Sequence, residues 1–447
     1  MSILTALTVA AALASGAAGD GWKAGVARVE ITPAEPMWLA GYAARDHEAQ
    51  GGAVHPLWVK AMAIEDAAGT RALVITSDVL GFPKPVSDNI FDRLLASTGL
   101  DRARIILNSS HTHSGPVIDG SLLCIYPLDE AGLEKVRRYT PLLEDKVVAA
   151  GEAAFKDMAP VRLESANGVT RFAVNRRNNK EAEIETTYNL NGPVDHAVPV
   201  LRVSRDDGQP LAILFGYACH NTTLCEYKWC GDYAGFAQED LEKAHPGTTA
   251  LFFQGCGGNQ NPLPRRTVSR ARQYGAELAA AVEAAMAEPM TPLDPSLKTA
   301  RSEVELFLET PPDRAGLVKI TETDNEYNRR AATEMIAQLD AGQSLRTSYM
   351  YPVQVWNLGG LPLVALAGEI VVDYAIHAKN ILGPRCFVMG YSNILVSYIP
   401  TAAIIREGGY EGGGAQLMYG MPNKWREDIE TRIVETISAV AKQAGLL

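Results

Sequence analysis

The sequence lacks the features that define several broad classes of protein. No basic run is longer than two residues, and 41 Lys and Arg against 52 Asp and Glu give a net charge of −11. The chain therefore has no broad basic face, which excludes binding to a nucleic-acid backbone. Beyond the N-terminus, no stretch reaches the roughly 18 uninterrupted apolar residues that a membrane helix needs. No internal repeat or low-complexity linker is present. These absences indicate a globular protein without a transmembrane span.

Several cysteine and hydrolase motifs are absent as well. The six cysteines form no C-x-x-C pair, so their spacing does not support a cysteine-based zinc site. Cys219, Cys225 and Cys230 lie close together in the sequence. They either include one disulfide, if the protein is exported, or are small buried residues. There is also no G-x-S-x-G, H-E-x-x-H or Walker A motif.

The first 19 residues form an apolar segment that ends in small residues. This composition is typical of a secretory signal peptide, although Lys and Arg are missing from its beginning. An N-terminus without a targeting function is the alternative. We therefore expect either a secreted or periplasmic protein, or a cytoplasmic one.

The remaining chain has the composition of a globular α/β protein. Hydrophobic residues make up 47% and charged residues 21% of its 447 residues. Strand-like runs, such as 104–107, 211–217 and 363–367, alternate with helix-like runs, such as 139–158 and 270–286. This alternation predicts mixed β-sheets flanked by helices. We expect one large catalytic domain over residues 20–447.

Two histidines stand close together in the segment 108–116, which reads NSSHTHSGP. His111 and His113 follow the strand-like run at 104–107. If the segment stays extended, both imidazoles point to one side, because strand side chains alternate with a period of two. Paired imidazoles at a strand end suit a divalent metal, or a base beside one. Hydrogen-bonded histidines without a metal are the alternative, but the chain has only eight histidines, which favours a metal site.

Two further residues repeat this placement at the end of an apolar run. His220 follows the run at 211–217, and Glu369 follows the run at 363–367, where we expect it to open a helix. Pockets of α/β proteins form at the carboxyl ends of strands. A His-His-Glu set is typical of catalytic zinc. The alternatives are a core histidine bonded to a backbone carbonyl and a carboxylate stabilised by the helix dipole.

These segments resemble the N-terminal catalytic domain of the neutral/alkaline (non-lysosomal) ceramidases. The resemblance begins at 25–33, which reads GVARVEITP, and extends through Gly41, Tyr42 and His55 to 410–412. The histidine segments at 108–116 and 218–222 and the pair 368–369 match motifs of the family. Two tyrosines that composition alone would not single out, Tyr398 and Tyr410, match two tyrosines of the family.

The resemblance implies a set of site residues. It implies one zinc ion bound by His111, His220, Glu369 and Tyr398. It also implies that His113 is a second active-site histidine, that Arg176 faces the scissile group, and that Tyr410 is a hydrogen-bonding residue. By this resemblance we expect a ceramidase-like hydrolase of lipid metabolism, acting on a sphingolipid or another N-acyl compound.

The sequence departs from the family at three places, one of which is a shorter loop after His220. Asn261 replaces a family serine that precedes a proline, and we expect no C-terminal β-sandwich domain of the kind that the family carries. A carboxamide cannot act as a nucleophile, but it can orient a substrate or a water. We therefore expect catalysis by metal-activated water without an acyl-enzyme. A simple turn at Asn261-Pro262 is the alternative.

The most specific function that follows is zinc-dependent hydrolysis of an amide bond in an N-acyl compound. Zinc would lower the pKa of bound water toward about 7, and His113 would transfer protons. Arg176 and Tyr410 would stabilise the oxyanion. The alternatives are a zinc hydrolase of esters or non-lipid amides, and a catalytically silent protein that retains the metal. An amidohydrolase barrel is less consistent, since its H-x-H would lie on the first strand.

Overall fold

The computed structural model describes residues 21–447. The predicted signal segment, 1–19, lies outside the described residues. Within the described part of the chain, no helix is both long and apolar enough to cross a membrane.

The larger sheet is mixed and runs in the order β4-β3-β2-β1-β5-β7-β8-β9, with β11 paired to β5. The neighbours β3–β4 and β8–β9 are parallel, and the other neighbours are antiparallel. Its strands are β1 (Trp22–Glu30), β2 (Trp58–Glu65), β3 (Arg71–Ser77), β4 (Ile105–Ser109), β5 (Ala159–Val169), β7 (Ala197–Ser204), β8 (Pro210–Tyr217), β9 (Thr249–Gln254) and β11 (Thr291–Pro292).

A second sheet is built by the C-terminal part of the chain, in the order β12-β13-β14-β16. Only its β14–β16 pair is parallel. Its strands are β12 (Leu297–Phe307), β13 (Ser348–Leu358), β14 (Leu361–Leu366) and β16 (Phe387–Met389). Two small pairs complete the strands: β6 (Ala173–Asn175) with β10 (Gln260–Pro262), and β15 (Glu369–Ile370) with β17 (Tyr398–Ile399).

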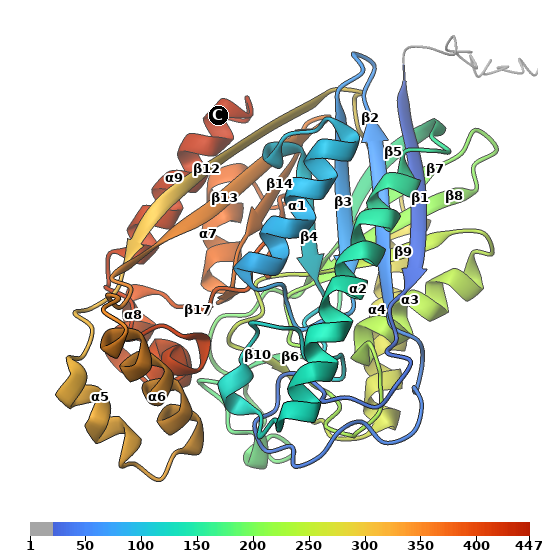
Figure 1. Cartoon of the computed structure of the whole chain (residues 1–447). Coiled ribbons are helices and arrows are strands. Elements are labelled where there is room, and N and C mark those ends of the chain that lie inside the picture. Colours follow the sequence, from blue (N-terminus) through green and yellow to red (C-terminus); the bar gives the residue numbers. More distant parts are fainter. Residues whose placement is uncertain (1–20) are drawn as a thin grey trace, which may run out of the picture.

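Helices cover the outer faces of both sheets (Figure 1). On the larger sheet, α1 (Lys84–Thr98) and α2 (Glu130–Ala154) cover the β1–β4 half, while α3 (Asp232–Ala244) and α4 (Val268–Ala287) cover the other half. On the second sheet lie α7 (Asp373–Leu382) and α9 (Ile429–Gln443). A separate hairpin of α5 (Arg314–Thr321) and α6 (Glu326–Asp340) stands at the lower left of Figure 1.

The inner faces of the two sheets pack on each other, which gives four layers. Strand β3 shows the pattern: Leu73 and Ile75 pack under α1 and α2, whereas Val74 packs with Trp356 and Leu363 of the second sheet. A strand buried on both faces has a continuous apolar run, which is how this strand reads in the sequence. The prediction of mixed sheets flanked by helices is confirmed.

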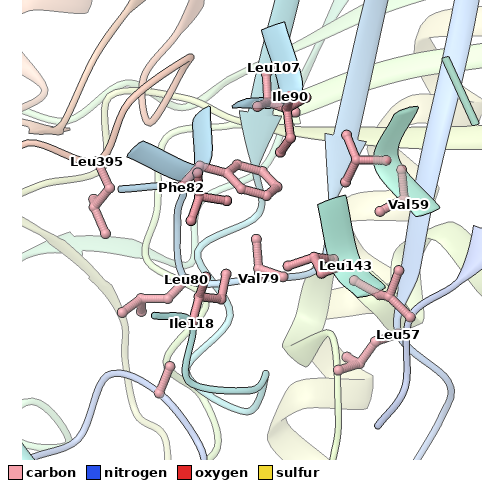
Figure 2. Close-up of a cluster of buried hydrophobic side chains, with 14 of the residues drawn as sticks. Leu57, Val59, Val79, Leu80, Phe82, Ile90, Leu107, Ile118, Leu143 and Leu395 are labelled. Carbon is pink, nitrogen blue, oxygen red and sulfur yellow. The ribbon is translucent and has the colours of Figure 1, made fainter. Parts of the chain in front are cut away.

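Figure 2 shows the buried cluster that surrounds the chain after β3. Val79, Leu80 and Phe82 insert their side chains among residues such as Leu57 and Leu143, and all of these are at most 2% exposed. Removing apolar surface of this extent from water is worth about 1.5–3 kcal/mol per large side chain. The main chain at Val79 and Leu80 is therefore held firmly, and its carbonyl groups point toward the first histidine segment.

Candidate metal centre

The predicted site residues meet at the carboxyl ends of strands from both sheets. His111 follows β4, His220 follows β8, and Glu369 opens β15 directly after β14. Tyr398 begins β17, which pairs with β15 in parallel so that Glu369 and Tyr398 are register partners. The strands before these segments include the parallel pairs β3–β4, β8–β9 and β14–β16, so their loops emerge at the same edge.

Asn108, at the end of β4, ties these loops together. It is fully buried, and its amide Nδ2 donates to the carbonyl of Gly390 at 2.7 Å. Its Oδ1 accepts from the backbone N–H of Gln254 at 2.9 Å. A second hydrogen bond joins the loop of His111 to the loop of His220: Asn221 Nδ2 donates to the carbonyl of Ser110 at 2.6 Å. The two sheets are thus joined by buried polar contacts directly behind the site.

Backbone carbonyls fix the orientation of His111 and His220. His111 Nδ1 lies 2.6 Å from the carbonyl of Leu80, and His220 Nδ1 lies 2.6 Å from the carbonyl of Gly257. A carbonyl can only accept, so both Nδ1 atoms carry the proton. In each neutral ring, the unprotonated Nε2 then keeps a lone pair that is available to a metal ion. This is the arrangement that orients metal-binding histidines.

The two Nε2 atoms converge on one carboxylate oxygen. Glu369 Oε2 lies 3.2 Å from His111 Nε2 and 3.0 Å from His220 Nε2. With neutral imidazoles, all three atoms are acceptors whose lone pairs face one another, an arrangement that a cation between them would stabilise. His111, His113 and His220 together place ring nitrogens within 4.8 Å of one another and could hold a metal ion. The residues therefore fit a metal centre.

The ionisation of the cluster is consistent with metal binding. Burial, together with the nearby Arg176, lowers the pKa of His220 to about 4. Burial, together with His111 and His220, also holds the pKa of His113 well below its ordinary value. Burial of Glu369 acts to raise its pKa, but positive charge on the adjacent His111 and His220 holds it well below the ordinary value. A metal cation at the same place would stabilise the carboxylate in the same way while the rings stay neutral. Neutral imidazoles and an ionised carboxylate are the forms that bind metals.

His113 lies beside this cluster, and its ring packs against Gly41 and Tyr42. Its Nε2 is 3.2 Å from His111 Nε2, and its Nδ1 is buried without a hydrogen-bond partner. Tyr42 packs on the ring at a centroid distance of 4.6 Å. Gly41 has φ +92°, and a Cβ there would approach the His113 ring to 2.3 Å, so only glycine fits. Gly41 and Tyr42, which are part of the resemblance to the ceramidase family, thus have a structural role: both pack against the ring of His113.

Arg176 connects the cluster to its surroundings. Its guanidinium donates to the Tyr398 hydroxyl at 3.0 Å, to Glu411 at 2.7 Å and to Asn261 Oδ1 at 3.3 Å. Burial of Arg176 acts to lower its pKa, but Tyr398 and Glu411 hold it well above the ordinary value. The Tyr398 hydroxyl lies 3.4 Å from His220 Nε2. Burial raises the pKa of the Tyr398 hydroxyl well above its ordinary value, and the positive charge of Arg176 opposes this rise.

Tyr410 and Asn261 complete the set predicted from the sequence. Tyr410 is 49% exposed, its ring lies 5.2 Å from that of Tyr398, and burial of its hydroxyl end raises its pKa to about 12. Asn261 lies in β10, not in a turn, which removes the turn interpretation. Because Arg176 donates to its Oδ1, its Nδ2 is left to donate elsewhere.

Two expectations about local structure are wrong. The H-x-H segment is not extended, since His111 has φ 59°, in the left-handed region. Its imidazole still meets that of His113, because the backbone N–H groups of His111 and His113 bond to the carbonyls of Val79 and Asn221. Glu369 does not open a helix: it begins β15, and α7 starts at Asp373. Pairing with β17 takes the place of the expected helix.

Two residues that contact the cluster, Tyr419 and Glu411, were not among the predicted site residues. Tyr419, in the short helix η5 (Gln416–Tyr419), donates its hydroxyl proton to Glu369 Oε1. Glu411 is 4% exposed and pairs with both Arg176 and Arg177. Only the position of Glu411 next to Tyr410 pointed toward the site. The structure contains all six cysteines as free thiols, so the alternative of a disulfide among Cys219, Cys225 and Cys230 is not realised.

Comparisons with known proteins agree with this geometry. The chain resembles the crystal structure of neutral ceramidase from Pseudomonas aeruginosa, with 20% identity, a TM-score of 0.73, and coverage of 95% of this chain and 75% of that one. A structure described as ceramidase complexed with C2 gives 20% identity, a TM-score of 0.74, and coverage of 95% and 76%. At this identity the two structures establish the fold. No curated protein sequence matches the chain.

The family itself is established by the sequence. The family described as neutral/alkaline non-lysosomal ceramidase, N-terminal, matches residues 22–285, which include His111, His113 and His220. The matched residues are more than half of the chain. They cover most of the larger sheet together with α1–α4. The chain belongs to the neutral/alkaline non-lysosomal ceramidase family.

Proposed function

We propose that the protein is a zinc-dependent hydrolase that cleaves the amide bond of an N-acyl compound. The observation that carries this proposal is the convergence of His111 Nε2 and His220 Nε2 on Glu369 Oε2, at 3.2 and 3.0 Å. The Tyr398 hydroxyl lies beside them, 3.4 Å from His220 Nε2. Membership of a ceramidase family supports the choice of an amide. Nitrogen and oxygen donors in this number are typical of catalytic zinc.

His111, His220, Glu369 and Tyr398 would hold the ion. A zinc ion bound there would supply Lewis-acid polarisation of a carbonyl and would lower the pKa of water. Arg176 is the residue that makes a tyrosine ligand reasonable, because its guanidinium, 3.0 Å from the hydroxyl, stabilises negative charge on that oxygen.

His113 is suited to transfer protons. It stands next to the cluster with an unpartnered Nδ1, and its lowered pKa keeps the ring neutral and able to accept a proton at neutral pH. It would accept a proton from the attacking water and deliver it to the departing amine. Tyr42 and Gly41 enclose the ring and so restrict its orientation.

Arg176 and Tyr410 would stabilise the negative charge that develops on the amide oxygen. Asn261 would orient the substrate or the water through its free Nδ2, since its Oδ1 is already bonded to Arg176. No hydroxyl nucleophile occupies this position, so we expect water to attack the carbonyl directly, without an acyl-enzyme.

Metal analysis combined with turnover tests this function. Purified protein should contain about one zinc per chain, as one donor set of this kind holds a single ion. His111→Ala and His220→Ala should lose it, whereas His245→Ala, which removes a histidine paired with Glu283 away from the site, should keep it. The unaltered chain should also hydrolyse a panel of N-acyl amides.

The outcomes separate the alternatives. Normal zinc content in both site variants would refute the ligand assignment. Zinc without turnover of any amide or ester would favour the silent metal-retaining protein, and faster turnover of esters than of the matched amides would favour an esterase.

A further inference from the structure

Two cavities of different character flank the metal centre. The first, of about 280 Å³, lies between α6 and the segments 120–124, 395–396 and 417–420. The second, of about 570 Å³, lies between the segments 176–181, 261–265 and 407–411. Tyr419 borders the first cavity and donates to Glu369, while Arg176, Asn261 and Tyr410 border the second. Both cavities therefore adjoin the same cluster.

Most of the side chains that line the first cavity are apolar, and Ser121, Glu334 and Gln338 add polar groups at its border. The apolar side chains that line it include Leu122, Leu123, Met335, Leu395, Leu417 and Met418. Cys124 on its border is buried, and burial raises the pKa of its thiol to about 11, whereas the carboxyl of Glu334 stands at the exposed side of the cavity. A cavity of this composition favours a hydrocarbon chain over a polar group.

The second cavity is polar and charged. The cations on its border are Arg176, Arg177, Lys180 and Arg265, and the carboxylates are Glu181, Glu407 and Glu411. Leu263 is its only aliphatic lining residue. Most of these charges pair with one another, as in the contacts of Arg265 with Glu181 and of Arg177 with Glu411. A long alkyl chain in this cavity would strip water from charged groups without replacing their partners, which is unfavourable.

We propose that the substrate is an N-acyl compound with a single acyl chain of medium length and a polar amine portion. The acyl chain occupies the apolar cavity beside Tyr419, and the amine portion occupies the charged cavity beside Arg176. The scissile amide then lies between them, at Tyr398, whose ring is 6.0 Å from Tyr419 and 5.2 Å from Tyr410. This inference rests on the proposed amide hydrolysis and specifies its substrate class.

The volume of the apolar cavity sets the chain length. A cavity of 150 Å³ holds one benzene molecule, so 280 Å³ holds about eleven carbon atoms in the same proportion, enough for a chain of ten. Cations exceed carboxylates by one on the border of the charged cavity (four against three), which favours a carboxylate on the amine portion. A decanoyl amide of glycine has both features and serves as the probe.

The first test uses the unaltered protein. We expect kcat/KM for acyl-glycines to rise from acetyl to decanoyl and to fall for hexadecanoyl, because the longer chain exceeds the cavity. Decanoyl-glycine should also be cleaved faster than decanoyl-sphingosine, whose amine portion carries a long alkyl chain. A steady rise through hexadecanoyl, or faster cleavage of decanoyl-sphingosine, would overturn the proposal.

The second test fills the apolar cavity. Ala331 of α6 lines the cavity and is 3% exposed, whereas Ala337 of the same helix is exposed. Ala331→Phe should lower the ratio of decanoyl-glycine to acetyl-glycine cleavage roughly tenfold, the loss expected when about two methylene groups no longer fit. Ala337→Phe is the matched control and should leave the ratio unchanged. Equal ratios in the two variants would refute the cavity assignment.

Binding of decanoate, measured by calorimetry, separates this inference from the proposed function. Decanoate should bind to the unaltered chain and to Ala337→Phe, and more weakly to Ala331→Phe, whether or not any amide is cleaved. Such binding without amide turnover would refute the hydrolase but support the cavity. If amides are cleaved but Ala331→Phe binds decanoate as tightly as the unaltered chain, the result would support the hydrolase and refute the assignment of the acyl chain to this cavity. Thermal melting of both variants verifies that the helical hairpin still folds.

Discussion

Tyr419 provides a sharp test of the metal centre, because its hydroxyl contacts Glu369 and nothing in the sequence singled it out. The hydroxyl donates to Oε1, so that Oε2 remains directed at His111 and His220. Tyr419→Phe removes only this oxygen. A hydrogen bond to a charged group contributes about 1.5–3 kcal/mol. At 1.4 kcal/mol per factor of ten, this corresponds to a loss of roughly 10- to 100-fold in zinc affinity, which is also the typical effect of removing an outer partner of a metal ligand.

The assay is competition for zinc against a chelator of known affinity at neutral pH. Tyr139→Phe is the matched control, since the buried hydroxyl of Tyr139 donates to the carbonyl of Ile31 at 2.6 Å, on α2 and away from the cluster. The control should lose about 1 kcal/mol of stability and keep its zinc affinity. If Tyr419→Phe binds zinc as tightly as the unaltered chain does, then Tyr419 does not orient Glu369 in the metal-bound state, and the reasoning is wrong.

Further predictions concern the tyrosine ligand, acid stability, the mechanism and the physical state of the substrate. Tyr398→Phe should weaken zinc binding without unfolding the protein, as metal analysis and melting curves would reveal; unchanged affinity would exclude Tyr398 as a ligand. In chelated protein, the folded pKa of His220, about 4, lies below its ordinary value near 6.5, so the unfolded state binds more protons between these values. Stability should therefore fall by about 3 kcal/mol as the pH drops from about 6.5 to about 4, and urea unfolding of His220→Gln should show a shallower decline. Asn261→Ala should lower kcat roughly 100-fold with little effect on stability, and mass spectrometry of quenched reactions should detect no acyl adduct. Short soluble amides should be cleaved faster than vesicle-embedded ceramide, because a net charge of −11 does not favour an anionic bilayer; a preference for vesicles would contradict this.

The fold class and the main site segments could be predicted because their signals are local. A strand buried on both faces, such as β3, appears as a continuous apolar run. The boundaries of helices were harder to predict: the apolar pattern at 139–158 missed the first nine residues of α2, which begins at Glu130 after the cap formed by Asp129, and ran past its end at Ala154. The N-cap is marked by a single aspartate that accepts from the backbone of Gly132, so the longer apolar pattern determined where we placed the start of the helix.

The contacts between segments could not be predicted in the same way. The left-handed conformation of His111 depends on backbone bonds to Val79 and on a buried cluster formed by distant residues. Tyr419 reaches Glu369 across 50 residues of sequence, and nothing in its neighbours distinguishes it from the other tyrosines. Such contacts are set by how the two sheets pack, which residue patterns along one strand do not specify.

The joint between the two sheets at Asn108 has a consequence for the order of folding. His111 and His220 belong to the larger sheet, whereas Glu369 and Tyr398 belong to segments that follow the second sheet, and Asn108 bonds to Gly390 across the joint. The cluster therefore forms only after the docking of regions that are far apart in the chain, and contacts of high sequence separation form slowly. During refolding from denaturant, high-affinity capture of zinc should lag behind the recovery of helical signal. A fragment limited to residues 22–285 would contain both histidines and still lack the carboxylate on which they converge.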